Sequence, residues 1–320
     1  MFTGPGDAAG AVVSVDGLRV RYGETIAVDR VSLAIQPGEI FGILGPNGAG
    51  KTTTVECIGG LRKANEGTIK VLGLDPTKDS EELHEQVGVQ LQTSELPDKL
   101  RVGEAMELFA SFYRDPADPG ELLERLGLDS KRNDRYTNLS GGQKQRLSIA
   151  MALIGNPRLA ILDELTTGLD PQSRRETWKL IEDMRERGVT VILVTHFMEE
   201  AEYLCDRVAL FHHGHVIATN TPAALGAGVG TKISFVAPGV TDLGRFEALS
   251  EAREVKLHEG RVVIEGSGDV TAAVIAQLVR DGIVPEQTRI EQSTLDDAFV
   301  TLTAEADAED AALAAQEVTL

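Results

Sequence analysis

The chain has 320 residues, of which 42% are hydrophobic and 25% are charged, a composition typical of a globular protein with room for one large and one small domain. Its 50 acidic and 31 basic residues give a net charge of −19 at pH 7, which argues against nucleic acid as a partner and against attachment to anionic lipid by charge alone. We find neither a signal peptide nor an apolar run of the roughly 20 residues needed to span a bilayer, so we expect any work at a membrane to depend on another chain.

The chain begins with a tail that leads into a β-rich segment. Residues 1–11 are rich in Gly, Ala and Pro and are expected to form a flexible tail. Residues 12–22 and 25–36 alternate apolar and polar side chains, which predicts two half-buried antiparallel strands. The apolar run 39–44 predicts a buried strand, and residues 53–61 predict a helix.

Between this strand and this helix lies Gly-Pro-Asn-Gly-Ala-Gly-Lys-Thr, the G-x-x-x-x-G-K-T pattern of a phosphate-binding P-loop. Its glycines let successive backbone N–H groups face one anion at a helix N-terminus, Lys51 adds a positive charge, and Thr52 offers a hydroxyl to Mg²⁺. The alternative is a glycine-rich turn with an unrelated lysine. We predict that the chain binds a nucleoside triphosphate here. The predicted nucleotide-binding residues are Gly45, Pro46, Asn47, Gly48, Ala49, Gly50, Lys51, Thr52 and Thr53.

The large domain continues with alternating strands and helices. Between about residues 94 and 152 the pattern is helical, which predicts a helical subdomain. The apolar runs 159–162 and 189–194 are typical of a parallel sheet, and a predicted helix, 171–187, lies between them. We therefore expect an α/β fold with a parallel core, an antiparallel β edge and a helical subdomain, within a domain of residues 12–221. The other predicted elements are strands 67–73, 87–92, 207–211 and 215–219 and helices 102–113, 120–126 and 142–154.

A second domain is predicted at residues 222–302. Its order βαββαβ, followed by a terminal helix, resembles a ferredoxin-like α+β domain. Val270, Val274 and Leu278 form an apolar helix stripe that we expect to pack on the domain's own sheet, with a dimer contact as the alternative. Without clusters of His, Cys or paired carboxylates, the domain is expected to be structural or regulatory. Residues 303–320 are acidic and Ala-rich and are expected to be a tail, as a frayed helix or disordered. The predicted strands are 232–236, 254–257, 261–265 and 287–291, and the helices are 243–249, 270–281 and 295–302.

Two carboxylates follow the apolar run 159–162. Asp163 and Glu164 would emerge at the carboxyl end of a buried strand, where ligands bind in open α/β sheets. We predict that Asp163 holds Mg²⁺, directly or through water, and that Glu164 orients or deprotonates the attacking water. The alternative is a strand that ends in a solvated acidic turn.

A second candidate phosphate site is the segment Leu-Ser-Gly-Gly-Gln at residues 139–143. Ser140 can cap the following helix, and Gly141 and Gly142 expose backbone N–H groups at its positive end. A second phosphate site in one domain cannot easily reach the same nucleotide, so Ser140, Gly141, Gly142 and Gln143 are expected to serve a nucleotide held by another subunit. The alternative is an ordinary Ser-Gly-Gly cap.

With the P-loop before it and the Asp-Glu strand after it, this segment resembles the signature of ABC ATPases, and the resemblance covers about residues 12–220. The resemblance implies that Tyr22 stacks on adenine and that His196 is the catalytic switch histidine at the γ-phosphate. It also implies that Gln92 senses Mg²⁺ and the membrane partner, with Gln90 as the less favoured candidate for this role. It also implies that Thr52, Gln92 and Asp163 are the metal residues and that the loop ending at Asp170 communicates across a dimer. The alternatives are an edge-strand aromatic for Tyr22, an exposed polar residue for Gln92, an N-cap before Pro171 for Asp170, and a polar strand end for His196.

Two further segments, 195–207 and 294–302, are similar to ATPase subunits of exporters of the daunorubicin-resistance type. With one P-loop and one signature, the chain resembles half of a head-to-tail homodimer that uses ATP and Mg²⁺ to drive a separate transmembrane permease. The expected cargo is a drug-like or other small amphipathic molecule, and the expected location is cytoplasmic, on the inner face of the membrane through the permease. The two cysteines, Cys57 and Cys205, fit a reducing compartment. A soluble ABC ATPase acting on ribosomes or DNA, or an importer subunit, is the alternative. One departure is Leu165, where the family usually has proline, and this leaves the stiffness of the 164–170 loop open.

Overall fold

The computed structural model describes residues 10–91, 96–237, 242–258, 260–266 and 269–317. The chain divides into two compact units, Met1–Thr219 and Asn220–Leu320, so the boundary lies two residues before the expected one. No helix among the described residues is long and apolar enough to cross a bilayer.

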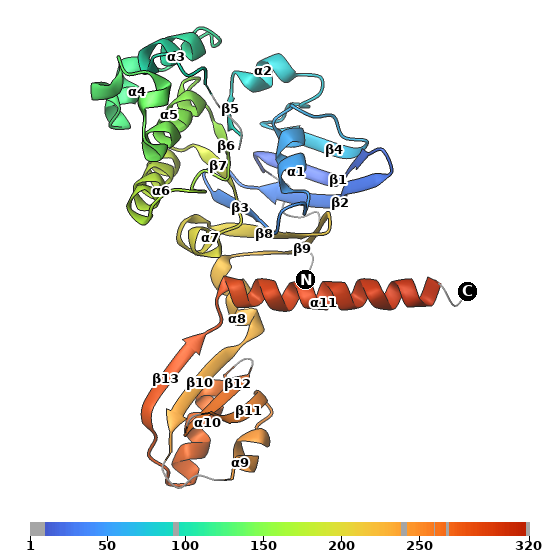
Figure 1. Ribbon diagram of the computed structural model, residues 1–320. Helices are drawn as coiled ribbons and strands as arrows, with labels where there is room; N and C mark the ends of the chain where they lie inside the picture. Colours follow the sequence, from blue (N-terminus) through green and yellow to red (C-terminus); the bar gives the residue numbers. More distant parts are fainter. Residues whose placement is uncertain (1–9, 92–95, 238–241, 259, 267–268, 318–320) are drawn as a thin grey trace. The chain divides into compact units, whose positions relative to one another are not determined.

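A six-stranded sheet forms the centre of the first unit (Figure 1). Five of its strands are parallel, as the continuous apolar runs predicted, and each of the three central ones is buried along its whole length. A hairpin adds the sixth strand at one edge. In spatial order the strands are β5 (Val87–Gln90), β6 (Leu159–Asp163), β7 (Thr190–Thr195), β3 (Ile40–Leu44), β8 (Arg207–His212) and β9 (His215–Asn220).

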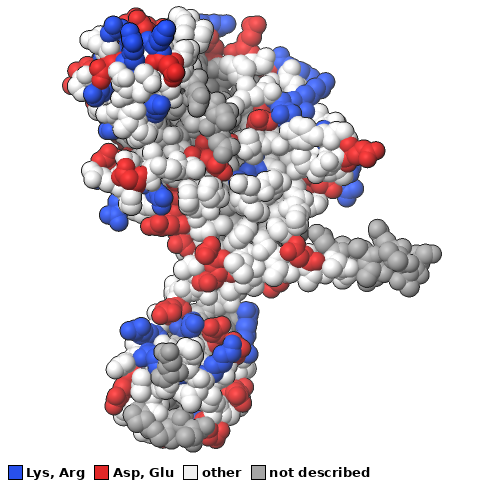
Figure 2. Space-filling model, in the orientation of Figure 1, with Lys and Arg blue, Asp and Glu red and all other residues white. Residues whose placement is uncertain are grey.

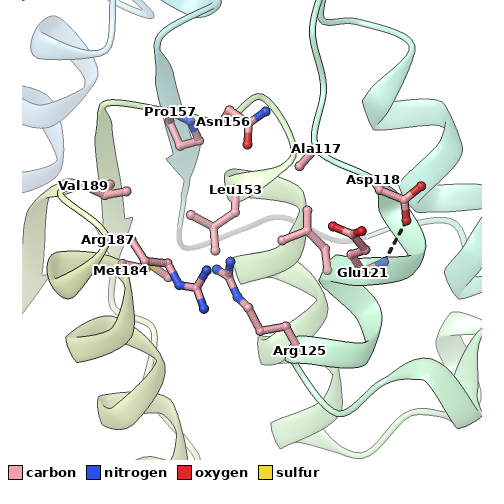
Figure 3. Close-up of a pocket in the computed structure, with 11 residues that line it drawn as sticks. Ala117, Asp118, Glu121, Arg125, Leu153, Asn156, Pro157, Met184, Arg187 and Val189 are labelled. Carbon is pink, nitrogen blue, oxygen red and sulfur yellow. Dashed lines mark hydrogen bonds between the residues drawn. The ribbon is translucent and has the colours of Figure 1, made fainter.

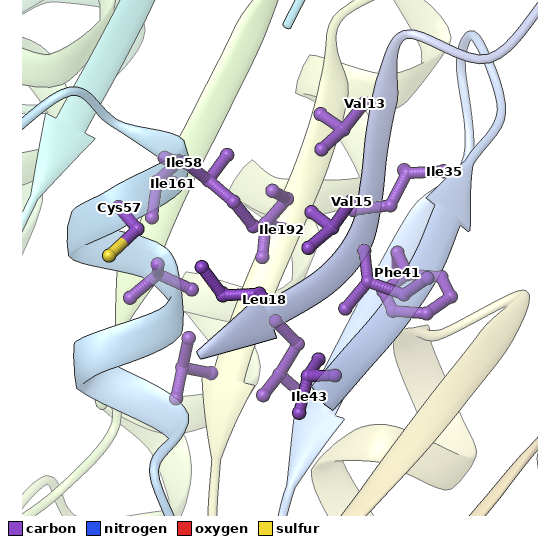
Figure 4. Packing of buried hydrophobic residues seen from close by; sticks show 14 of the residues in the cluster. Val13, Val15, Leu18, Ile35, Phe41, Ile43, Cys57, Ile58, Ile161 and Ile192 are labelled. Atoms are coloured by element: carbon purple, nitrogen blue, oxygen red, sulfur yellow. The ribbon is translucent and has the colours of Figure 1, made fainter. Parts of the chain in front are cut away.

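A three-stranded antiparallel sheet, in the order β2-β1-β4, completes the β structure of this unit. Its strands are β1 (Val13–Tyr22), β2 (Thr25–Ile35) and β4 (Glu66–Val71). Side chains from this sheet, from the parallel sheet and from helix α1 (Lys51–Ile58) share one core, to which Leu18, Ile43, Ile161 and Ile192 all belong (Figure 4). This packing fixes the start of α1 between the two sheets.

Among the remaining helices of the first unit, those between residues 102 and 153 fall within the expected helical subdomain (Figure 1). The first subdomain helix ends at Ala110, three residues earlier than predicted. Helix α5 packs against β5 and against α6, which ties the subdomain to the parallel sheet. The helices are α2 (Ser80–His84), α3 (Val102–Ala110), α4 (Pro119–Arg125), α5 (Gly141–Leu153), α6 (Pro171–Glu186) and α7 (Met198–Leu204).

The second unit contains a four-stranded antiparallel sheet in the order β11-β12-β10-β13. This is the strand order of a ferredoxin-like domain, as the sequence predicted. Val270, Val274 and Leu278 are buried in its core, so the predicted stripe packs on its own sheet. The elements are α8 (Pro222–Val229), β10 (Thr231–Val236), α9 (Gly244–Glu247), β11 (Ala252–His258), β12 (Arg261–Gly266), α10 (Val270–Arg280), β13 (Glu286–Gln292) and α11 (Leu295–Glu317).

Helix α11 is longer than predicted, and it gives the tail the first of its two expected states, helix or disorder. The helix predicted to end at residue 302 continues to Glu317, so most of the expected tail 303–320 is one continuous helix with the segment before it. Ala and Glu are strong helix formers, and their propensity explains why this segment is helical and not disordered. Within the second unit, α11 packs against α8.

Candidate active site

The P-loop connects β3 to α1 in a conformation that requires glycine. Gly45, Gly48 and Gly50 have φ angles of 151°, 83° and 96°, and a Cβ on Gly50 would lie 2.5 Å from the carbonyl oxygen of Ala27. Within the described part of the chain, no side chain caps α1 and its first turn has no acidic residue. The backbone N–H groups of that turn are therefore available to an anion, which the helix dipole would also favour.

Lys51 lies inside this loop and is 5% exposed. Its Nζ donates hydrogen bonds to the carbonyl oxygens of Gly45 at 2.7 Å and Pro46 at 3.0 Å. Burial lowers the pKa of the ammonium, and the nearby Glu164 and Asp163 carboxylates oppose that effect. The ammonium is thus held at the loop where phosphate oxygens would bind.

Thr52 and Asp163 meet at the carboxyl end of the parallel sheet. The Thr52 hydroxyl donates to Asp163 Oδ2 at 3.2 Å, while Asp163 Oδ1 is buried and has no hydrogen-bond partner among the described residues. Burial is the main cause that raises the pKa of Asp163 to about 6. A hydroxyl beside a buried carboxylate oxygen that lacks a partner is a donor set suited to Mg²⁺, so these residues fit the predicted ion.

Glu164 and His196 come together from neighbouring strand ends. Asp163 is opposite Val194 in the sheet, so the residues that follow both strands lie side by side, and His196 Nδ1 is 3.2 Å from Glu164 Oε1. The Glu164 side chain is 9% exposed. Its backbone has φ of 51°, a left-handed conformation that costs a residue with a Cβ about 1–3 kcal/mol. The fold therefore holds this carboxylate in place against a local backbone preference.

The signature segment caps α5. Ser140 Oγ accepts a hydrogen bond from the Gln143 N–H, and Gln143 Oε1 accepts one from the Ser140 N–H, which makes a capping box. Ser140 and Gly141 remain exposed. A Cβ on Gly142 would lie 2.9 Å from Ser173 Oγ, so glycine permits the close approach of α5 to α6. The structure thus shows the capping role, and the exposed N-terminus leaves a surface that a second molecule can reach.

Asp170 caps α6. Its Oδ1 accepts hydrogen bonds from the N–H groups of Gln172 and Ser173 at 3.0 Å each, and the Ser173 hydroxyl donates to Oδ2 at 2.7 Å. These bonds, with the Ser173 hydroxyl first, lower the pKa of Asp170. The capping alternative therefore describes its contacts in this chain, and its expected role between two chains stays a prediction.

Tyr22 lies beside the start of α1 with 45% of its surface exposed. Its hydroxyl is 3.2 Å from Thr53 Oγ1, and the Arg62 guanidinium lies 4.8 Å from the centre of its ring. Sequence reasoning missed Arg62, because only folding brings residues 40 positions apart together. Gln92 lies outside the described residues. The alternative candidate Gln90 is buried, and its Oε1 has no hydrogen-bond partner among the described residues.

A hollow of about 470 Å³ lies elsewhere, at the ends of α4, α5 and α6 (Figure 3). Arg125 and Arg187 face each other across it, and Asp183 forms ion pairs with both, at 3.6 Å and 3.0 Å. Asp118 on its wall caps α4 by accepting from the Glu121 N–H. None of the predicted site residues lines this hollow, so its polar groups serve the helix ends and not the chemistry.

A family model described as ABC transporter matches residues 28–167. The chain is 40% identical over 228 residues to a Nod factor export ATP-binding protein I of Ralstonia nicotianae, a match covering 69% of this chain and 71% of that protein. It is 34% identical to a daunorubicin resistance ATP-binding protein of Streptomyces coeruleorubidus, over 92% of this chain and 96% of the relative. It is 31% identical to a linearmycin resistance ATP-binding protein of Bacillus subtilis, over 91% and 98%.

Solved structures share the fold of the first unit. An ATP-binding subunit of an ABC transporter is 27% identical, with a TM-score of 0.61 over 67% of this chain and 91% of that one. A dimeric ATP-binding cassette in a post-hydrolysis state, bound to ADP and Pi, is 29% identical, with a TM-score of 0.59 over 65% of this chain and 98% of that one.

Proposed function

Because the chain belongs to the ABC transporter family of ATP-binding proteins, we propose that it hydrolyses ATP to drive a separate transmembrane permease that exports a small molecule. One observation carries the enzymatic part of this proposal. At the carboxyl end of the parallel sheet, the P-loop with Lys51 and Thr52 adjoins Asp163, Glu164 and His196. Phosphate-binding, metal-binding and proton-accepting groups thus converge where open α/β sheets bind ligands.

The residues divide the reaction between them. The first-turn N–H groups of α1 and Lys51 bind the phosphates, and Lys51 exchanges its bonds to the loop carbonyls for phosphate oxygens. Thr52 and Asp163 would hold Mg²⁺, which when bound neutralises charge on the β- and γ-phosphates. Glu164 accepts the proton of the attacking water as the water oxygen bonds to the γ-phosphorus and ADP departs with the electron pair of the broken P–O bond. His196 holds the Glu164 carboxylate in position.

Two copies are proposed to act head to tail. Each chain has one P-loop and one signature segment, and the N-terminus of α5 is exposed at Ser140 and Gly141. Placing that helix end against the γ-phosphate bound to the partner would add positive potential where negative charge develops. The solved cassette bound to ADP and Pi is dimeric, which supports the pairing of two ATPase chains.

The permease contact has a candidate surface at the end of α3. Leu108 and Phe112 are exposed by 47% and 63%, and Phe112 lines a hollow of about 400 Å³ together with Glu81, His84 and Glu85. Large exposed apolar side chains beside a hollow are suited to contact with another protein. A permease bound there would hold the ATPase at the cytoplasmic face of the membrane.

Export of a drug-like or other small amphipathic molecule is supported by relatives that are named for Nod factor export and for daunorubicin and linearmycin resistance. The alternative of action on ribosomes or DNA is less favoured by the net charge of −19. On the face of the first unit shown in Figure 2, acidic side chains are interspersed with Lys and Arg.

The test is co-purification with the membrane protein encoded by the neighbouring gene. We expect the wild type to remain with that permease in detergent and its ATP turnover to respond to it. Phe112→Asp should abolish co-purification and leave the basal ATPase rate of the isolated chain unchanged. The matched control Leu257→Asp, at an apolar position in β11 that is 55% exposed against 63% for Phe112, should bind normally. Normal permease binding by Phe112→Asp would remove this surface from the proposal. A neighbouring gene for a periplasmic binding protein would favour the importer alternative.

A further inference from the structure

Strand β13 is an open edge of the sheet in the second unit (Figure 1). All seven of its residues are exposed, and within the described residues it pairs only with β10. Free edge strands present unpaired N–H and C=O groups to other chains, and proteins usually shorten, bulge or cover them or place charged side chains on them. The length and exposure of β13 therefore leave it able to pair with a strand of another chain.

The direction of its backbone groups follows from the pairing with β10. Thr231 is opposite Gln292, and the Ser293 N–H donates to the Gly230 carbonyl at 3.2 Å, which makes Thr231 and Gln292 a pair without hydrogen bonds between themselves. Alternation along the strand gives Ile290 the same orientation. Ile290 and Gln292 therefore direct their N–H and C=O groups away from β10, towards the open side.

The charged side chains of β13 can pair with those of β13 in a second copy of the chain. Arg289 and Glu291 are opposite Ser234 and Lys232 on one face of the sheet, and neither has an ion-pair partner among the residues that the structure describes. If two copies of β13 pair antiparallel about a two-fold axis at Ile290, each Arg289 is opposite the other copy's Glu291. An axis one residue away in either direction would instead place Arg289 or Glu291 opposite itself, which is unfavourable.

Helix α10 adds an apolar flank beside this edge. Asp281 forms an ion pair with Arg245 of α9 at 3.3 Å and accepts from Gln277 at 2.9 Å, so this side of α10 faces α9. Ile275 and Val279 lie on the opposite side and are 47% and 75% exposed. Helix α9 packs on β11 and α10 packs on β10, and the strand order is β11-β12-β10-β13. The side of α10 that points away from α9 therefore faces the edge formed by β13.

Ile290 belongs to the same face as this flank. It is opposite Ile233, which is fully buried under the helices, yet Ile290 is 52% exposed. The open edge thus combines outward backbone groups, a self-complementary charge pair and an apolar strip formed by Ile275, Val279 and Ile290.

We propose that a second copy of this chain docks here, β13 against β13, to form one eight-stranded antiparallel sheet with Ile290 on the two-fold axis. Two Arg289–Glu291 pairs lie on one face of the sheet, and the apolar strips of the two copies meet on the other. No residue of this contact belongs to the ATP site, so the association is independent of nucleotide and distinct from the head-to-tail dimer of the proposed function.

Charge exchange tests the register, with sedimentation velocity of the full chain in the absence of nucleotide as the measurement. We expect wild type to dimerise and Arg289→Glu or Glu291→Arg alone to weaken dimerisation about tenfold or more, because each variant faces itself with like charges. An equimolar mixture of the two variants restores both opposite-charge pairs and should regain dimers, as should the double variant R289E/E291R. A monomeric wild type, an Arg289→Glu variant that dimerises normally, or a mixture that stays monomeric would each overturn the proposal.

A second pair of variants tests the apolar flank. Val279→Glu should weaken the nucleotide-free dimer, whereas Leu257→Glu, an exposed apolar position on the opposite edge strand β11, should not. Both positions are exposed, so the folded state is retained, which circular dichroism checks. Equal effects of the two substitutions would contradict a contact at β13. ATP turnover, measured on the same samples, should be unaffected, which separates this result from any failure of the proposed function.

Discussion

Replacing Glu164 with glutamine removes the proposed proton acceptor and little else. Glutamine has nearly the same shape, retains an oxygen that can accept from His196 Nδ1, and meets the same backbone requirement at φ of 51°. The side chain is 9% exposed, so few water molecules can replace the lost carboxylate. The substitution therefore isolates the acid–base contribution from folding and binding.

The expected magnitude follows from that contribution. General base catalysis is commonly worth about 10²–10⁴-fold, which corresponds to about 3–5 kcal/mol of activation free energy at 1.36 kcal/mol per tenfold. We expect Glu164→Gln to lose turnover by this factor while its affinity for MgATP stays within a few-fold of wild type, because Lys51, Thr52 and Asp163 are unchanged. ATP should then accumulate in a stable dimer.

The assay combines phosphate release with the binding of a fluorescent ATP analogue. Glu199→Gln is the matched control, since Glu199 is a largely exposed glutamate on the nearby helix α7 and forms a long ion pair with Arg174 at 3.9 Å. The control should retain normal turnover. Turnover of Glu164→Gln within tenfold of wild type would refute the role of Glu164 as proton acceptor, and lost ATP binding would show that the carboxylate belongs to the binding site.

Two further substitutions probe the metal carboxylate and the signature. Burial raises the pKa of Asp163 to about 6, above its ordinary value, so the folded chain binds a proton more tightly than the unfolded chain and loses stability as pH rises through this window. Without metal, Asp163→Asn should therefore have an unfolding free energy about 3 kcal/mol above that of wild type at pH 7.5, and this difference should become smaller towards pH 5. The variant should also lose Mg²⁺-dependent ATP binding. A difference in unfolding free energy that stays constant with pH in urea titrations would contradict this. Ser140→Arg should block ATP-dependent dimerisation, measured by size exclusion, and leave the nucleotide affinity of the monomer unchanged. The control Ser130→Arg, a similar change at another exposed position of the helical subdomain, should leave dimerisation intact. A Ser140→Arg variant that still dimerises with ATP would contradict the shared site.

The sequence predicted those parts of the fold that depend on local patterns. The parallel strands were visible as apolar runs, the P-loop as a motif, and the ferredoxin-like order as a succession of elements. The same patterns locate the carboxyl ends of β6 and β7. Because these parallel strands are adjacent, the residues that follow them, Glu164 and His196, are expected to lie close together.

Other features depend on tertiary contacts that no local pattern reveals. Arg62 reaches the ring of Tyr22 only because α1 packs beside the antiparallel sheet. The buried Asp163 oxygen without a partner and the left-handed backbone of Glu164 are properties of the assembled site. Helix α11 is longer than predicted because the acidic, Ala-rich composition of its C-terminal part has two opposing effects. The negative charge favours disorder, whereas the high helix propensity of Ala and Glu favours a helix, and here the helix propensity prevails.

Leu165 shows how packing can replace a covalent constraint. The family resemblance leads to proline at this position, whose ring would fix φ and restrict the residue before it. Here Leu165 is 1% exposed, so burial of its side chain anchors the loop. Hydrogen bonds hold the backbone on both sides, from the Glu164 N–H to the Val194 carbonyl at 2.9 Å and from the Leu169 N–H to the Thr166 carbonyl at 3.2 Å. Because Glu164 occupies a left-handed conformation that a following proline would make still less favourable, leucine permits the backbone geometry that brings the carboxylate to His196, and the core supplies the stiffness that the ring would have given.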